Sequence, residues 1–151
     1  MPDLPKVQSL DHALRWLDRL QAAALVKSET EWPVAAVLEH LAQSTEMSMD
    51  GFPVHKSALF QHTAGAAAFA VFKLRGRMSH GLTAAIPGAP ALRMDAALAA
   101  SAERLCAAIV RFQRHQGPLQ PHFAYGRLSH ADFALAHAMH IANHQDAMTV
   151  S

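Results

Sequence analysis

Apolar residues recur at intervals of three and four along most of this chain, and that spacing places them on one face of a helix. The clearest stripe steps by four, three, four and three through Leu98, Ala102, Leu105, Ile109 and Phe112. No segment shows the alternation of apolar and polar residues that is typical of a half-buried strand. The sequence therefore predicts an all-α fold.

Capping residues and turn-forming residues divide the chain into five predicted helices. They span roughly 10–26, 31–48, 58–75 and 96–116, and the last begins after Ser129, where Asp132 completes a start like a capping box. The expected N-caps of the first four are Ser9, Thr30, Ser57 and Asp95. Residues 78–94 are rich in Gly and Pro and are expected to form a long loop, which in a compact domain is typically functional or covers something.

The lengths of the connections indicate how these helices are arranged. Short connections make the first two long helices antiparallel neighbours, and the same holds for the last two. The stretch between residues 48 and 95 contains the extra helix and is long enough to cross the whole bundle. The sequence therefore predicts a single domain over residues 1–151, a four-helix bundle with an extra helix in the long connection, for which an up-down-down-up order is permitted.

Charge and composition exclude several classes of protein. The 13 basic and 12 acidic residues nearly cancel, so no overall field would recruit nucleic acid or an anionic membrane surface. The start of the chain lacks a secretory signal pattern, and the longest apolar run, residues 64–72, is too short to span a membrane. A cytoplasmic protein is therefore expected. Cys106 is the only cysteine, which excludes an internal disulfide and a cysteine-based zinc motif.

The last helix carries three of the 11 histidines on one face. Phe133, His137, His140 and His144 step by four, three and four, the spacing of a face that points into the core. Buried imidazoles need partners, and a divalent metal ion is one partner that satisfies several at once. His140 and His144 lie four apart, so their ring nitrogens can converge on one ion. The alternative is that these histidines bond to one another, to Ser or Gln side chains, or to water.

A third candidate ligand lies in the second helix, in the segment "EHLAQS". His40 occupies a core-facing position between Val37 and Ser44, where it can face the last helix. Together with His140 and His144 it would form a three-histidine metal site with open coordination positions. Glu39 is expected to point outward, and the H-E-x-x-H motif that supplies a metalloprotease base is absent from the sequence.

Four further residues are candidates for the surroundings of this site. His137 shares the stripe but lies about 4.5 Å along the helix axis from His140, so we expect it to act over the cavity rather than as a ligand. His122 and Tyr125 can reach a ligand over the end of the bundle, or can stabilise their own turn. His62 can line the same cavity or occupy a partly exposed helix position. The other histidines are expected at the surface or in loops: His12, His55, His80, His115 and His130.

The chain resembles the DinB-like (YfiT-like) superfamily of metal-binding four-helix bundles. The residues that carry the resemblance are His40 in "EHLAQS" and the pair His140 and His144 in "HAMHIANHQ", together with four further segments over most of the chain: "SMDGFP", "FQHTAG", "IPGAP" and "HFAYGRLS". These four segments extend the resemblance to a poorly characterised branch of that superfamily. The resemblance implies up-down-down-up topology, a zinc or nickel ion at the three histidines and, in characterised members, a low-molecular-weight thiol as cofactor. Asn143 stands where relatives often have another histidine.

These observations lead to one expected function and two alternatives. The expected function is a metal-binding DinB-like protein, a metal-dependent thiol transferase or hydrolase in which water or a thiol occupies the open position. The first alternative is a non-catalytic stress protein that binds a metal or a small ligand. The second is a helical dimer whose histidines belong only to the core. The expected partners are a small-molecule ligand or substrate and a second copy of the chain, with neither nucleic acid nor membrane.

Overall fold

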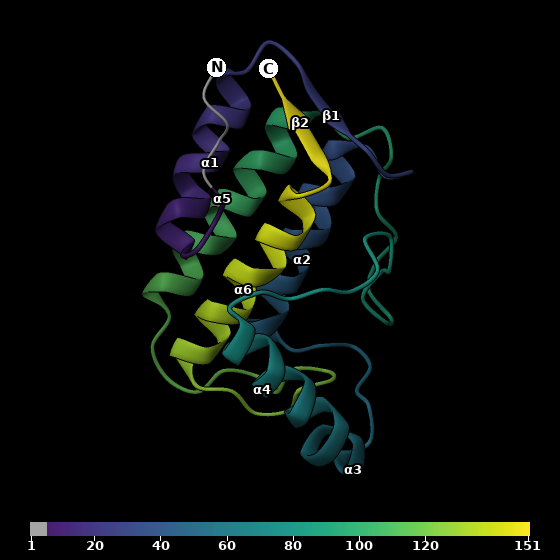
Figure 1. The fold of residues 1–151 in the computed structure, drawn as a ribbon, viewed down its shortest axis with the longest axis vertical. Coiled ribbons are helices and arrows are strands. Elements are labelled where there is room, and N and C mark those ends of the chain that lie inside the picture. The colour runs from purple at the N-terminus through teal and green to yellow at the C-terminus, as the bar shows by residue number, and fades with distance from the viewer. Residues whose placement is uncertain (1–5) are drawn as a thin grey trace.

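The structure, a computed structural model, describes residues 6–151 and is mostly helical (Figure 1). The long helices are α1 (Leu10–Ala22), α2 (Val34–Asp50), α5 (Leu98–Arg114) and α6 (His130–Gln145). Between α2 and α5 lie the short helix α3 (Ala58–Phe60), a π-helical turn (Gln61–Gly65) and helix α4 (Ala66–Arg75). The coarse prediction of a helical fold is confirmed, and no helix in residues 6–151 has the length and hydropathy needed to cross a bilayer.

Local capping chemistry explains where several of these helices begin. The side-chain oxygen of each of three predicted N-caps accepts a backbone hydrogen bond of 3.1 Å, at Ser9, Ser57 and Ser129. The other two predicted caps are wrong, because α2 begins after Pro33 and α5 after Ala97, without a side-chain cap. Thr30 instead accepts a bond from the backbone N–H of Trp32 in the turn before α2.

A short strand pair corrects the expectation that the chain contains no strand. Strand β1 (Val26–Ser28) pairs antiparallel with β2 (Met148–Val150), and Leu25 and Ser151 extend the pairing by two backbone bonds of 2.9 Å. Helix α1 ends at Ala22, so the end of the helix predicted over residues 10–26 is wrong. The pairing joins the segment that follows α1 to the segment that follows α6.

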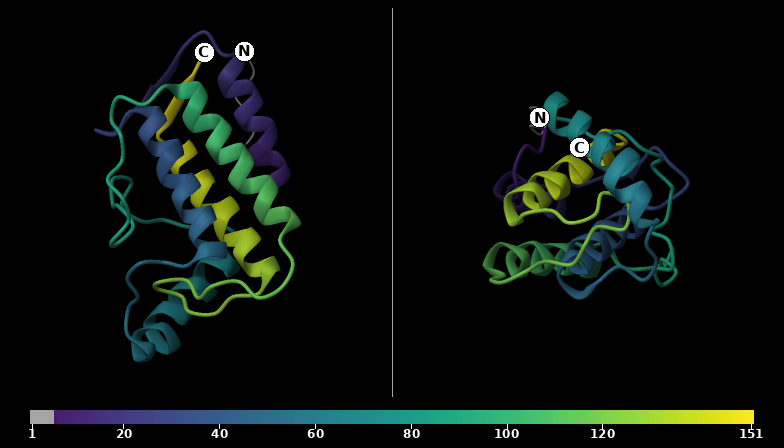
Figure 2. Two further views of the ribbon diagram at one scale, coloured as in Figure 1. Left: turned by 180° about the vertical axis from the view of Figure 1, so that it is seen from behind. Right: turned by 90° about the horizontal axis from the view of Figure 1, so that it is seen from below.

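The four long helices lie side by side and enclose the main core (Figures 1 and 2). The most extensive contact between helices is that of α2 with α5. The largest fully buried apolar side chains are Leu17, Leu20, Leu38, Leu41, Leu105, Ile109, Phe112, Phe133 and Ile141. Near the other end of the bundle, the backbone N–H of Gln120, after α5, donates to the carbonyl of Ser48 near the end of α2 at 2.8 Å.

Helix α2 is buried on almost every side, and this burial includes polar side chains. The side chain of Glu39 is only 7% exposed, so the expectation that it points outward is wrong. Its carboxylate accepts a bond from Nη1 of Arg104 on α5 at 3.3 Å and another from the backbone N–H of Arg93 at 3.2 Å. Arg104 also binds the carboxylate of Glu46, two turns further along the same side of α2. These donors compensate for the loss of water around Glu39.

The chain between α4 and α5, residues 76–97, will be called the covering loop. It runs alongside α2 (Figure 1). Side chains of α2 bind its backbone. Gln43 Nε2 donates to the carbonyl of Pro90 at 3.0 Å, and Glu39 accepts from the N–H of Arg93. Within the loop Met78 and Ile86 are each 6% exposed. The predicted long loop is therefore fixed to the bundle by both polar and apolar contacts.

The helix predicted over residues 58–75 has the expected span but is not a regular α-helix. A π-helical turn occupies residues 61–65, where Gln61 Nε2 donates to the carbonyls of Lys56 and Phe123 at 3.0 and 3.4 Å. At Gly65 the backbone lies so close to the carbonyl of Ala124 that an added Cβ would collide with it. This segment is therefore packed directly against the chain that connects α5 and α6.

We expect the ion pairs around Glu39 to contribute far more to stability than those at the surface. Substituting Arg104→Met leaves the buried Glu39 carboxylate with fewer donors and should lower the free energy of unfolding by about 2–3 kcal/mol. The control is Arg111→Met, which breaks the exposed pair with Asp50 and should leave the free energy of unfolding nearly unchanged. Urea unfolding of both variants measures the difference, and equal losses would contradict the assignment.

Candidate metal centre

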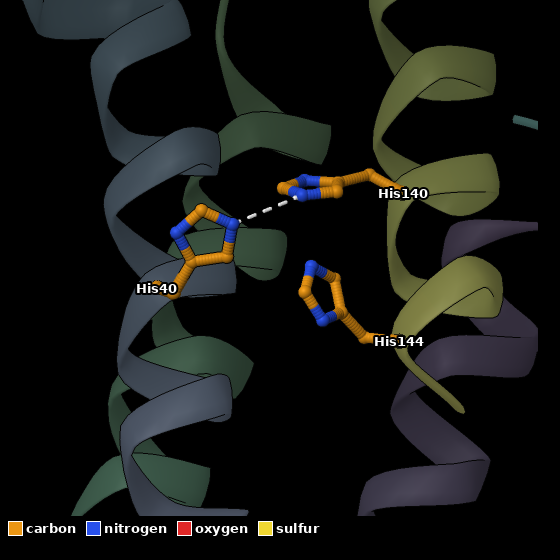
Figure 3. A group of neighbouring side chains, drawn as sticks. All are labelled: His40, His140 and His144. Carbon is orange, nitrogen blue, oxygen red and sulfur yellow. Dashed lines mark hydrogen bonds between the residues drawn. The ribbon is translucent and has the colours of Figure 1, made fainter. Parts of the chain in front are cut away.

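Three histidine side chains from two helices meet inside the bundle. His40 on α2 points toward His140 and His144 on α6, and each residue offers one ring nitrogen such that all three lie within 4.8 Å of one another (Figure 3). The Nε2 atoms of His40 and His140 are 3.2 Å apart. His40 is 3% exposed and His144 is 2% exposed. The structure therefore brings together the three residues that the sequence analysis selected as ligands.

The geometry and the free ring nitrogens fit a metal ion. Two nitrogens that each lie about 2.0–2.1 Å from a tetrahedral ion are about 3.3 Å apart, close to the separation of the His40 and His140 nitrogens. Within residues 6–151, the buried atoms His40 Nδ1 and His144 Nε2 have no hydrogen-bond partner. His144 Nε2 points toward the other two rings (Figure 3). A cation between the rings would give this nitrogen a partner, and the three histidines could hold such an ion.

Burial keeps these imidazoles in the neutral form that binds metals. Loss of hydration, together with the smaller effect of the neighbouring His80, lowers the pKa of His40 to about 4. Loss of hydration also lowers the pKa of His144 to about 3, with added repulsion from His40 and His80, and holds the pKa of His140 well below its ordinary value. A neutral imidazole has a lone pair available without first losing a proton.

A cavity of about 310 Å³ opens beside the histidine cluster. Its lining includes His40 and His140, and its walls are mostly apolar, from α6 and from the covering loop. Lys56 is the only lining residue in residues 6–151 with a permanent charge, and no carboxylate lines the cavity. A small molecule in this space would contact the two histidines directly.

His137 lies in the cavity wall but outside the group of three. Its Nε2 is 3.0 Å from Oγ of Ser48, and that hydroxyl donates its own hydrogen to the carbonyl of Thr45 at 2.6 Å. The hydroxyl can therefore only accept from His137, so Nε2 carries the proton and Nδ1 has the lone pair. The His137 ring packs against Phe112 and Phe133, and burial lowers its pKa to about 3.

The other predicted cavity residues divide into two groups. His122 and Tyr125 both line the cavity, and their rings stack at a centroid distance of 4.1 Å. His122 Nδ1 also accepts bonds from the N–H groups of Ala124 and Tyr125 at 3.1 Å, so it stabilises its own turn as well. Burial lowers the pKa of His122 to about 3 and raises that of Tyr125 to about 12. His62 is exposed on the π-helical turn and is not among the lining residues.

Sequence reasoning missed His80, which it assigned to the group of surface and loop histidines. His80 does lie in the covering loop and is exposed, but its ring centroid is 4.9 Å from that of His140 and 5.9 Å from that of His144. It also lines the cavity. The signal that could have found it was the long loop itself, whose only histidine is His80.

The buried His137 should make the metal-free protein sensitive to acid. Between about pH 6.5 and about pH 3, this histidine is protonated in the unfolded chain and neutral in the folded chain. The free energy of unfolding therefore falls by roughly 1.4 kcal/mol for each unit by which the pH is lowered in this range. Urea unfolding with a chelator at about pH 7 and about pH 5 measures the loss. In His137→Phe the loss between these pH values should be roughly 2 kcal/mol smaller. Equal losses in both proteins would contradict this account.

Comparison with known proteins gives a family but no function. No curated protein and no solved structure matches the chain. The sequence pattern of a family described as "Protein of unknown function (DUF1569)" matches residues 3–151. The match includes α2, α6 and the covering loop, and thus every residue of the histidine cluster. The chain therefore belongs to the DUF1569 family of proteins of unknown function.

Proposed function

We propose that this protein binds a divalent metal ion at His40, His140 and His144 and uses the remaining coordination position to bind a small molecule in the adjoining cavity. Zinc and nickel are the candidate metals, because both accept neutral imidazole ligands. The observation that carries the proposal is the convergence of three buried imidazoles, one with an unpartnered nitrogen aimed at the others, beside a cavity. An ion with only structural ligands would have no need of that space.

The reaction class that we propose is group transfer or hydrolysis, with a low-molecular-weight thiol as the candidate cofactor. A divalent ion on three neutral imidazoles would supply a Lewis acid at neutral pH. The chain's own residues supply the surroundings: the apolar side chains of Met78 and Phe133 in the wall keep the space low in water. The Nδ1 lone pair of His137 and the hydroxyl of Tyr125 are the groups available to accept or donate a hydrogen bond there.

We also infer the helix order of a DinB-like bundle, up-down-down-up. Two contacts support it. Pairing of β1 with β2 brings together the segments that follow α1 and α6, so these two helices would run in the same direction. The bond from Gln120 to Ser48 brings together the ends of α5 and α2, so these two would share the opposite direction. This order agrees with the resemblance carried by His40, His140 and His144.

A second candidate function is a non-catalytic protein that binds a metal or a small ligand. The observation that favours it is the lining of the cavity, which has no carboxylate in the described part of the chain. Its histidines have pKa values far below neutrality, which makes them weak bases. The two candidates share the metal site and differ in whether a bound molecule is converted, which product analysis with metal-loaded protein distinguishes.

The proposal predicts one divalent ion per chain in untagged protein. The variants His40→Ala, His140→Ala and His144→Ala should each lose the ion, because two imidazoles hold it far less tightly than three. His137→Ala is the matched control, since it removes an imidazole from the same helix without touching the group, and it should retain the ion. Elemental analysis after dialysis measures the stoichiometry. Added metal should also raise the melting temperature of the wild-type protein through linkage.

Tryptophan emission gives a second readout of the same site. The ring of Trp32 lies 5.3 Å from that of His40, so a paramagnetic ion such as nickel should quench its emission, and Trp32→Phe should abolish the response.

Loss of metal in His137→Ala as complete as in His144→Ala would make His137 a ligand. Wild-type protein that neither retains metal nor gains stability from it would exclude the proposed function.

A further inference from the structure

The histidine cluster contains a fourth ring, which the covering loop supplies. The centroids of His40, His140 and His144 are 5.0 or 5.1 Å apart in every pair. His80 lies 4.9 Å from His140 by the same measure, so it is as close to one proposed ligand as the proposed ligands are to each other. The nitrogens of His80 do not belong to the group of ring nitrogens that lie within 4.8 Å of one another. His80 is therefore adjacent to the three proposed ligands.

The hydrogen bonding of His80 leaves the ring nitrogen that a metal ion needs. Its Nδ1 is 3.3 Å from the carbonyl oxygen of Gly81, which can only accept a hydrogen bond. A neutral His80 therefore carries its proton on Nδ1 and has a lone pair on Nε2. Metal-bound histidines commonly donate their other N–H to a backbone carbonyl in this way. His40 Nδ1, by contrast, has no such acceptor in residues 6–151.

The attachment of the covering loop lets His80 move without disturbing the core. Met78 and Ile86 are buried on either side of it, while residues 79–85 between them are largely exposed. Further along, the loop backbone is fixed to Glu39 and Gln43, which lie on the same helix as His40. Residues 79–85 are therefore a short exposed segment held at both ends next to the cluster.

We propose that His80 is a fourth and exchangeable ligand of the metal ion. It closes the coordination shell in the resting protein and gives up its position to a small molecule that enters the cavity. This inference rests on the proposed three-histidine site. Binding of His80 brings residues 79–85 closer to the ion. The exposed position of the loop explains why this ligand, unlike the three on helices, leaves readily.

Cobalt-loaded protein provides the test, because the visible absorption of Co²⁺ reports the number and type of its ligands. His80→Ala should alter the absorption spectrum and weaken Co²⁺ affinity by about tenfold or more. Free imidazole added to the variant should restore the wild-type spectrum by filling the vacated position. The matched control is His12→Ala on α1, a histidine outside the cavity lining, which should behave as wild type.

Hydrogen exchange supplies a readout that is independent of the spectrum. Metal should slow amide exchange in residues 79–85 of the wild-type protein and should not do so in His80→Ala. Unchanged helicity of the metal-free variant, expected for an exposed loop residue, verifies its fold. The same spectrum in wild type and His80→Ala, without an effect of imidazole, would overturn the inference, while loss of Co²⁺ in His40→Ala would still uphold the three-histidine site. A wild-type protein that binds no Co²⁺ would overturn both.

Discussion

The burial of α2 on almost every side is the constraint on which the rest of this structure depends. The polar side chains of a helix in that position need hydrogen-bond partners within the protein. The neighbouring elements supply these partners. Helix α5 provides Arg104 for Glu39, and α6 provides His137 for Ser48. The covering loop provides the carbonyl of Pro90 for Gln43. His40 differs from these residues, because its Nε2 lies beside another imidazole nitrogen and its Nδ1 has no hydrogen-bond partner in residues 6–151. This difference marks the position of the candidate site.

Local signals predicted most of the fold and the centre of the site. The caps at Ser9 and Ser129 depend only on neighbouring residues, and the stripe of histidines on α6 depends only on helical spacing. Features that depend on distant parts of the chain were missed. Strand β1 has only three residues, too few for a visible alternation, and it exists because β2 lies beside it. The inward position of Glu39 depends on Arg104, 65 residues away.

The same distinction explains why the sequence predicted only part of the histidine cluster. Ligands on helices follow a periodic spacing, so His40, His140 and His144 could be selected from the sequence. His80 has no periodic context, and its place beside His140 results from how the covering loop is attached to α2. The clustering of several neutral imidazoles is unfavourable without a shared partner, because each loses hydration and gains few hydrogen bonds in return. The bundle offsets this with the apolar core formed by its four long helices.

The close approach at Gly65 has a consequence for how the sequence of this chain can change. The backbone at Gly65 lies directly against the carbonyl of Ala124, so at this point the segment "FQHTAG" meets the segment "HFAYGRLS" with no room for a side chain at position 65. Any side chain at position 65 demands a simultaneous shift of the turn that places His122 and Tyr125 in the cavity. The two segments should therefore vary together among related chains, and a protein engineer who transplants one of them into another bundle must transplant the other as well.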